Sequence, residues 1–182
     1  MLSAGAEKWV KLNDIEYPYN VSGLVACDGC VHAIGSSGGT KFYVGLPSER
    51  ISETNLYSVQ SCYDYISSAA VCRLGNNIYL LGGITDEEEA SNLCVKYHIL
   101  DEKWSHVQEM VKPRAYCSVV KYDLRDHEFR DKEKDFWVIG GTDMKGKVYD
   151  CIEQLDECNN SFVPIDPNCV KLLTPRCQHI LF

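Results

Sequence analysis

The sequence has no excess of positive charge and no long apolar run. Its 182 residues carry 26 acidic and 18 basic side chains, which gives a formal net charge of -8. Phosphate binding needs clustered lysine and arginine, so this balance argues against nucleic acid as a partner. No stretch approaches the roughly 20 apolar residues that a membrane span requires, and no membrane contact is expected.

Local signatures of catalysis are also missing. Neither GxGxxG nor GxxxxGK[ST] occurs, so the glycine-rich turns are not phosphate-binding loops. The cysteines and the five histidines form no local pattern typical of a nucleophile and its base. We therefore predict that the chain is not an enzyme and that it needs no cofactor.

The first residues lack the basic segment followed by an apolar run that a secretory signal contains. A cytoplasmic location is therefore expected. Because thiols stay reduced in that compartment, the ten cysteines are expected to be free thiols rather than disulfides.

A possible zinc half-site is present near the start of the chain. Cys27 and Cys30 form a CxxC pair, and His32 follows closely. No second pair lies nearby to complete a metal site, and Asp28-Gly29 is a typical hairpin turn. We therefore interpret the segment as a β-hairpin and predict no metal.

One order of features recurs along the chain. A strand, a tight turn, a second strand and a glycine pair follow one another in residues 71–83, which end in Gly82-Gly83. Residues 117–141 show the same order and end in Gly140-Gly141. Residues 24–36 are a degenerate copy in which Ser36 replaces the second glycine. Self-similarity of this kind is typical of repeat architectures.

Two residues seven positions apart follow each glycine pair. In the two good copies they are Tyr97 with Trp104 and Leu155 with Phe162. In the degenerate copy two alignments stay open: Tyr57 with Asp64, or Leu56 with Tyr63.

These features together resemble the Kelch repeat, in which an arginine also opens the next unit. The best copy covers residues 73–110, and three copies with flanking pieces cover almost the whole chain. The resemblance implies an all-β fold, a partial β-propeller of about three four-stranded Kelch blades. The units are expected at residues 19–66, 67–112 and 113–165. Residues 1–18 would hold the last strand of a preceding blade, and residues 175–182 the first strand of a following one.

The resemblance also implies a module that recognises a protein partner, whose identity it does not give. The chain is most similar to the BTB-Kelch family, whose members mostly present substrates to a Cullin-3 ubiquitin ligase. The BTB and BACK segments that contact the ligase are not among these 182 residues. Binding of actin or the cytoskeleton is an alternative, and an oxidase-type enzyme on a Kelch scaffold is a further one.

In Kelch proteins, the loops after the Gly-Gly strand and the loops between blades share the face that receives the partner. The corresponding residues here are Asp86, Glu87, Glu88, Glu89, Asp143, Lys145, Ser36, Ser37 and Thr40. Arg114 and Arg176 follow a proline at the start of inner strands, where arginines of relatives clamp acidic peptides. A structural arginine bonded to neighbouring carbonyl groups is the alternative. Residues 121–135 form a charged insertion, which the resemblance places on the opposite face.

Overall fold

The structure is a computed structural model that describes residues 21–27, 30–35, 38–43, 53–58, 66–121, 136–156, 160–168 and 170–177. These residues form β-strands, turns and irregular segments, with no helix among them. The prediction of an all-β fold is confirmed for this part of the chain. It follows that no helix of the described ranges could cross a membrane.

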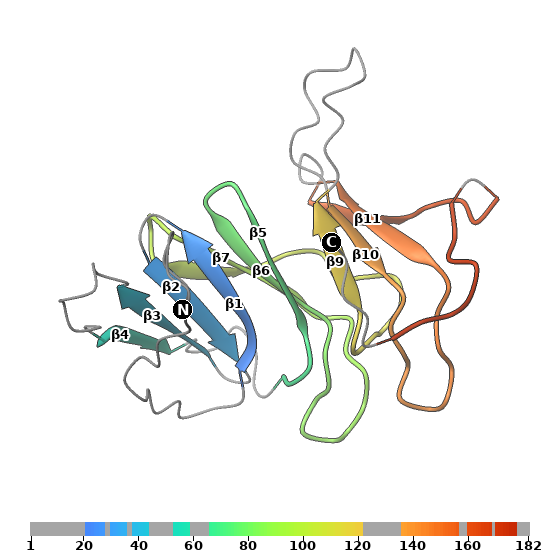
Figure 1. Ribbon diagram of the computed structural model, residues 1–182, viewed down its shortest axis with the longest axis horizontal. Coiled ribbons are helices and arrows are strands. Elements are labelled where there is room, and N and C mark those ends of the chain that lie inside the picture. The colour runs from blue at the N-terminus through green and yellow to red at the C-terminus, as the bar shows by residue number, and fades with distance from the viewer. Residues whose placement is uncertain are drawn as a thin grey trace, which may run out of the picture.

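The described strands form three four-stranded antiparallel sheets (Figure 1). The first sheet contains β1 (Val21–Cys27), β2 (Cys30–Gly35), β3 (Gly38–Tyr43) and β4 (Glu53–Ser58). The second contains β5 (Ala70–Leu74), β6 (Asn77–Leu81), β7 (Cys94–His98) and β8 (Lys103–His106). The third contains β9 (Ser118–Lys121), β10 (Phe136–Ile139), β11 (Ile152–Asp156) and β12 (Ser161–Pro164).

Each sheet is a simple meander, because every strand pairs with the next strand along the chain. The first strands of the three sheets lie side by side, with β1 next to β5 and β5 next to β9 (Figure 1). The sheets do not close into a ring within the described residues. Residues 175–177, expected to begin a further strand, are not part of a strand.

The second sheet is packed on both faces. Successive residues of a strand point to opposite faces, so β6 contributes to two buried clusters. Tyr79 belongs to the cluster shared with the third sheet, where its ring lies edge-on to Phe136 at 5.1 Å between centroids. Ile78 belongs to the cluster shared with Ile34 of the first sheet. The apolar faces of the three sheets therefore hold them together.

The glycine pair after β6 allows two segments to approach closely. Gly82 and Gly83 have φ angles of 61° and 111°, and Gly140 and Gly141 repeat this with 64° and 95°. A Cβ atom on Gly82 would lie 2.2 Å from the carbonyl oxygen of Arg114. No side chain fits there. The glycine pair therefore lets the backbone that follows β6 pass close to the segment that enters the third sheet.

The seven-residue spacing places side chains directly opposite each other on the third and fourth strands. Tyr97 faces Trp104 across β7 and β8, with 5.3 Å between the ring centroids. Leu155 faces Phe162 in the same way across β11 and β12. Seven positions therefore correspond to two strands joined by a short turn.

Both expected alignments of this pair in the first sheet are wrong. Leu56 and Tyr57 lie in the fourth strand, β4, and not in the third. β2 ends at Gly35 and β3 begins at Gly38, whereas β6 ends at Leu81 and β7 begins only at Cys94. The long connection of the other sheets is missing here, so the sequence offset shifts; Tyr63 and Asp64 lie outside the described residues.

Candidate functional site

One end of the second and third sheets gathers the connections between their middle strands and the segments that enter their first strands. The bridge between Ser67 and Ile84 joins the two kinds of segment in the second sheet, and the bridge between Ala115 and Thr142 joins them in the third. We call this end the loop face; it consists of residues 66–69, 82–93, 114–117 and 140–151. Both connections extend from the same end of the sheets in Figure 1.

Charged residues predicted from the sequence meet on the loop face. Glu89 of the second sheet's connection forms an ion pair with Lys145 of the third sheet's connection, with 3.2 Å between Oε1 and Nζ. Both side chains are exposed, and an ion pair of this kind contributes little to stability. Its value here is geometric, because it places the two connections side by side.

The two connections differ in charge. Asp86, Glu87 and Glu88 are exposed and make the connection of the second sheet acidic. In the third sheet's connection, Asp143 folds the turn inward, since its Oδ1 accepts from the backbone N–H of Lys145 at 2.8 Å and of Lys147 at 3.0 Å. These bonds, that to Lys147 first, lower the pKa of Asp143. Lys145 and Lys147 of this connection are exposed.

Of the three loop residues expected in the first sheet, the structure describes one, Thr40. Thr40 lies within β3 rather than in a loop. Ser36 and Ser37 lie outside the described residues, as do residues 122–135 of the charged insertion.

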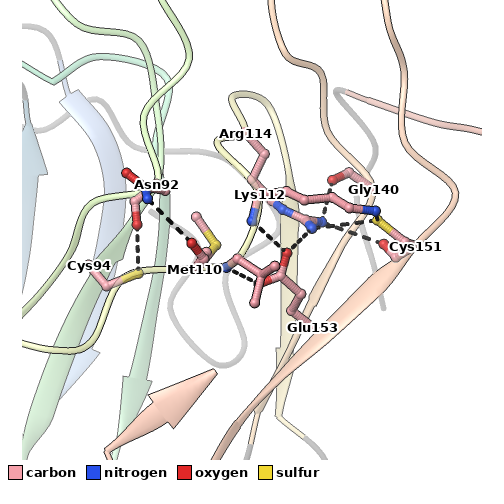
Figure 2. Close-up of polar contacts among 9 residues, drawn as sticks. Asn92, Cys94, Met110, Lys112, Arg114, Gly140, Cys151 and Glu153 are labelled. Carbon is pink, nitrogen blue, oxygen red and sulfur yellow. Dashed lines mark hydrogen bonds and ion pairs between the residues drawn. The ribbon is translucent and has the colours of Figure 1, made fainter. Parts of the chain in front are cut away.

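Arg114 has the structural role that was the alternative to partner binding (Figure 2). Its side chain is completely buried. Its Nη1 donates to the carbonyl oxygen of Gly140 at 2.8 Å, and its Nη2 forms an ion pair with Glu153 of β11. The expectation that Arg114 contacts a partner is therefore not retained, because its guanidinium is buried and bonds to Gly140 and Glu153 of the third sheet.

Glu153 completes this buried network (Figure 2). Its carboxylate accepts from the backbone N–H of Val111 at 2.7 Å and of Lys112 at 3.2 Å, in addition to Arg114. A buried carboxylate needs such a set of donors, since an unpaired charge inside a protein is very costly. The network ties the segment that leaves the second sheet to the third sheet.

Arg176 occupies the corresponding backbone position one sheet later. The N–H of Gly83 donates to the carbonyl oxygen of Arg114, and the N–H of Gly141 donates to that of Arg176. Unlike Arg114, Arg176 is exposed, and its Nε donates to Oγ1 of Thr174 at 3.2 Å. Arg176 is thus the predicted arginine that a partner can reach.

No feature of the sequence predicts the cavity that lies between the start of β1 and the segments that enter β5 and β9. Its volume is about 400 Å3, within the range of ligand sites. The residues that line it are Val21, Ser22, Ser67, Ser68, Ala69, Tyr116 and Cys117.

The lining consists of corresponding residues from the three sheets. Gly23, Ala70 and Ser118 are matched, because each lies opposite the corresponding residue of a second strand. Counting back two positions from each gives Val21, Ser68 and Tyr116, and counting back one gives Ser22, Ala69 and Cys117. Six of the seven lining residues therefore occupy two corresponding positions in each of the three sheets.

The backbone of two lining residues is unusual. Ser68 and Tyr116 both have a φ angle of 53°, in the left-handed region that residues other than glycine rarely adopt. The N–H of Tyr116 donates to the carbonyl oxygen of Ser68 at 3.2 Å, which links the entries of β5 and β9. Because neither residue is a glycine, the sequence contains no signal of this left-handed turn.

The thiols in the core between the second and third sheets have raised pKa values. Burial raises the pKa of Cys117 to about 11, and burial also raises the pKa of Cys72 and Cys94. They are therefore neutral thiols near pH 7. The five cysteines with described side chains, Cys72, Cys94, Cys117, Cys151 and Cys177, are free.

The CxxC segment pairs as a hairpin, with Cys27 opposite Cys30 across β1 and β2. His32 is buried, and its ring centroid lies 6.2 Å from that of Tyr97 in the next sheet. In the described part of the chain, no three or more His, Cys, Asp or Glu side chains gather as they would around a metal ion.

Comparison with known proteins relates the fold to solved structures. No family model matches the sequence, and no curated protein matches it. A solved structure titled "Structure of YjhT" matches with a TM-score of 0.64 at 12% identity, over 84% of this chain and 53% of that one. The chain thus spans about half the length of that structure, and a likeness at this identity shows the fold alone.

Proposed function

We propose that the three sheets are neighbouring blades of a Kelch-like β-propeller. Three features support this: each sheet is a four-stranded meander, the first strands lie side by side, and the glycine pairs recur at matched places. In a propeller, first strands line the central axis and each blade packs on the next. The two clusters on either side of the second sheet have that arrangement.

The function that this arrangement supports best is recognition of a protein partner by the loop face, without catalysis. The observation that carries the proposal is the ion pair between Glu89 and Lys145, which sets an acidic connection beside one that exposes two lysines, Lys145 and Lys147. Loops held on a rigid scaffold are common binding elements. A partner segment with basic residues toward Asp86–Glu88 and acidic residues toward Lys145 and Arg176 would complement this surface.

The biological role that fits the resemblance to BTB-Kelch proteins is presentation of the bound partner to a Cullin-3 ubiquitin ligase. In this role the chain supplies the recognition surface, and the ligase is contacted through other domains. A partner bound at the loop face should then accumulate when cullin-dependent ubiquitination is blocked in cells.

Proximity labelling in cells tests the recognition surface. The wild-type chain is compared with a charge reversal of each connection, Glu87→Lys and Lys145→Glu. Lys103→Glu is the matched control for Lys145→Glu, because it makes the same charge change on an exposed residue at the start of β8, at the opposite end of the second sheet.

We expect the two loop-face variants to lose the same labelled proteins and the control to keep them. Circular dichroism of each purified variant verifies that the fold is unchanged. A set of labelled proteins that is identical for wild type and both reversals would show that the loop face is not the interface.

A further inference from the structure

The segment at residues 172–176, which follows the third sheet, repeats the backbone of residues 110–114, which follow the second. In both, the first residue donates its N–H at 3.0 Å to a carbonyl oxygen in the connection of its own sheet. The arginine then donates its N–H to a second carbonyl oxygen there, at 2.9 Å for Arg114 and 3.1 Å for Arg176. A proline precedes each arginine. The two segments therefore direct corresponding groups outward from their sheets.

The donors of the earlier segment hold one carboxylate (Figure 2). Glu153 accepts from the N–H of Val111 at 2.7 Å and of Lys112 at 3.2 Å, and it pairs with the guanidinium of Arg114. The ion pair is buried, so its charges need both the opposite charge and the hydrogen bonds. A segment of this kind thus provides two backbone N–H groups and one guanidinium for a single acidic side chain.

The matching groups of the later segment are the N–H of Leu173, the N–H of Thr174 and the guanidinium of Arg176, which we call the three-donor site. Within the described ranges, neither N–H donates to an acceptor, and Arg176 forms no ion pair. The Arg176 side chain donates from Nε to Oγ1 of Thr174 at 3.2 Å, which leaves Nη1 and Nη2 for a ligand. All three residues are exposed.

The junction between the first and second sheets shows that the residue at this place is matched to what it meets. There Ile66 takes the position of Arg114, and Val95 takes that of Glu153. Both are apolar and lie in one buried cluster. An apolar residue thus meets an apolar residue, and an arginine meets a carboxylate. The arginine at position 176 consequently favours an acidic group.

We propose that the three-donor site binds a carboxylate of the protein partner, from a glutamate or aspartate side chain, with the contacts that Glu153 makes one sheet earlier. The inference rests on the proposed function and specifies one contact of the partner. A guanidinium can give a carboxylate two parallel hydrogen bonds. When the partner covers the site, water is excluded and the attraction between the two charges becomes stronger.

Selection from a displayed library of random peptides tests the proposal on the whole 182-residue chain. We expect the enriched peptides to share one glutamate or aspartate. One such peptide is synthesised with this acid and with the corresponding amide, glutamine or asparagine. The affinity of both peptides is then measured for wild type and for Arg176→Gln, which completes a double-mutant cycle across the contact.

We expect the amide peptide to bind wild type more weakly than the acidic peptide by roughly tenfold or more. The two peptides should bind Arg176→Gln within about twofold of each other, because the cation that distinguishes them is gone. Arg176→Lys keeps the charge without the planar fork and should restore only part of the difference.

Lys171→Gln is the matched control. It removes the same charge from an exposed residue of the neighbouring chain that is not one of the three donors. This variant should change the affinity for the acidic peptide by less than about threefold. Circular dichroism of each variant verifies that the fold is unchanged.

The other outcomes separate the two proposals. An equal loss on amidation for wild type and Arg176→Gln would overturn the three-donor site, because the acid would then bind elsewhere. Enriched peptides without an acid that lose affinity for Glu87→Lys or Lys145→Glu would also overturn it and leave the loop face as the interface. Enrichment of no peptide, or only of peptides insensitive to all these variants, would overturn the proposed function and the three-donor site with it.

Light scattering of the wild-type chain alone tests a second copy as the occupant. We expect the same oligomeric state for wild type and Arg176→Gln. Self-association that Arg176→Gln abolishes would overturn the assignment of the carboxylate to a partner, because another copy of this chain would then supply it.

Discussion

Replacing Arg114 with methionine should lower the free energy of unfolding by about 3–5 kcal/mol, because it leaves the buried carboxylate of Glu153 without its cation. Glu153→Gln should cost a similar amount, since it leaves the guanidinium of Arg114 buried and uncompensated. Both side chains are almost inaccessible to solvent, so water does not screen either loss.

The double variant Arg114→Met/Glu153→Gln should be little worse than either single variant. It contains no unpaired charge, and the glutamine oxygen can still accept the N–H of Val111. A double-mutant cycle should therefore give a coupling energy of about 2 kcal/mol or more.

The junction between the first and second sheets provides a matched control. Ile66 lies two positions before the left-handed Ser68, as Arg114 lies two positions before the left-handed Tyr116. Ile66 is buried in the cluster that contains Val95, whose place in β7 corresponds to that of Glu153 in β11. Ile66→Met, an apolar exchange of similar volume, should cost less than about 1.5 kcal/mol.

Urea unfolding of the whole chain, followed by circular dichroism, measures these differences from the midpoints at a constant slope. Independent effects of the two single variants, with a coupling energy below about 0.5 kcal/mol, would refute the role given to the pair. A loss for Ile66→Met as large as that for Arg114→Met would refute it as well.

Three further outcomes can be checked by urea unfolding. Gly82→Ala should be strongly destabilising, because its Cβ would lie 2.2 Å from a backbone oxygen, whereas Gly75→Ala, with φ 57° and open space, should cost only about 1–2 kcal/mol; equal losses would contradict the close approach. The free energy of unfolding should fall as pH rises from 9 to 11, because the unfolded state releases the thiol proton of Cys117 while the folded state keeps it. Cys117→Ser should reduce this slope by up to about 1.4 kcal/mol per pH unit. A slope unchanged by the substitution would contradict the raised pKa of Cys117. Lys145→Glu should change the unfolding free energy by less than about 1 kcal/mol, since its ion pair is exposed; a larger loss would mean that the connections support the fold.

Features encoded within short stretches of the chain could be predicted from the sequence. Glycine pairs, hairpin turns and the seven-residue spacing all report backbone geometry over a few neighbouring residues. They were sufficient for an all-β chain, for the strands of the second and third sheets and for the connection that carries Asp86–Glu89. In the first sheet the same template misplaced Leu56 and Tyr57, because a short connection between β2 and β3 broke the spacing on which the alignment depended.

The different burial of the two arginines depends on tertiary structure. Arg114 and Arg176 both follow a proline, and their carbonyl oxygens accept from the corresponding glycines Gly83 and Gly141, yet one arginine is buried and the other exposed. The difference comes from Glu153, 39 residues further along the chain, which the pairing of β9, β10 and β11 in the third sheet brings to Arg114.

The cavity likewise depended on the tertiary structure. Its lining comes from three segments separated by whole sheets, and the side chains of Ser22, Ser68 and Tyr116 carry no pattern that marks them in the sequence. Local sequence determines which residues can form a strand or a turn, because those preferences act over a few bonds. The burial of apolar faces between the sheets determines which segments that enter first strands lie together. It also determines which charged side chains are paired there.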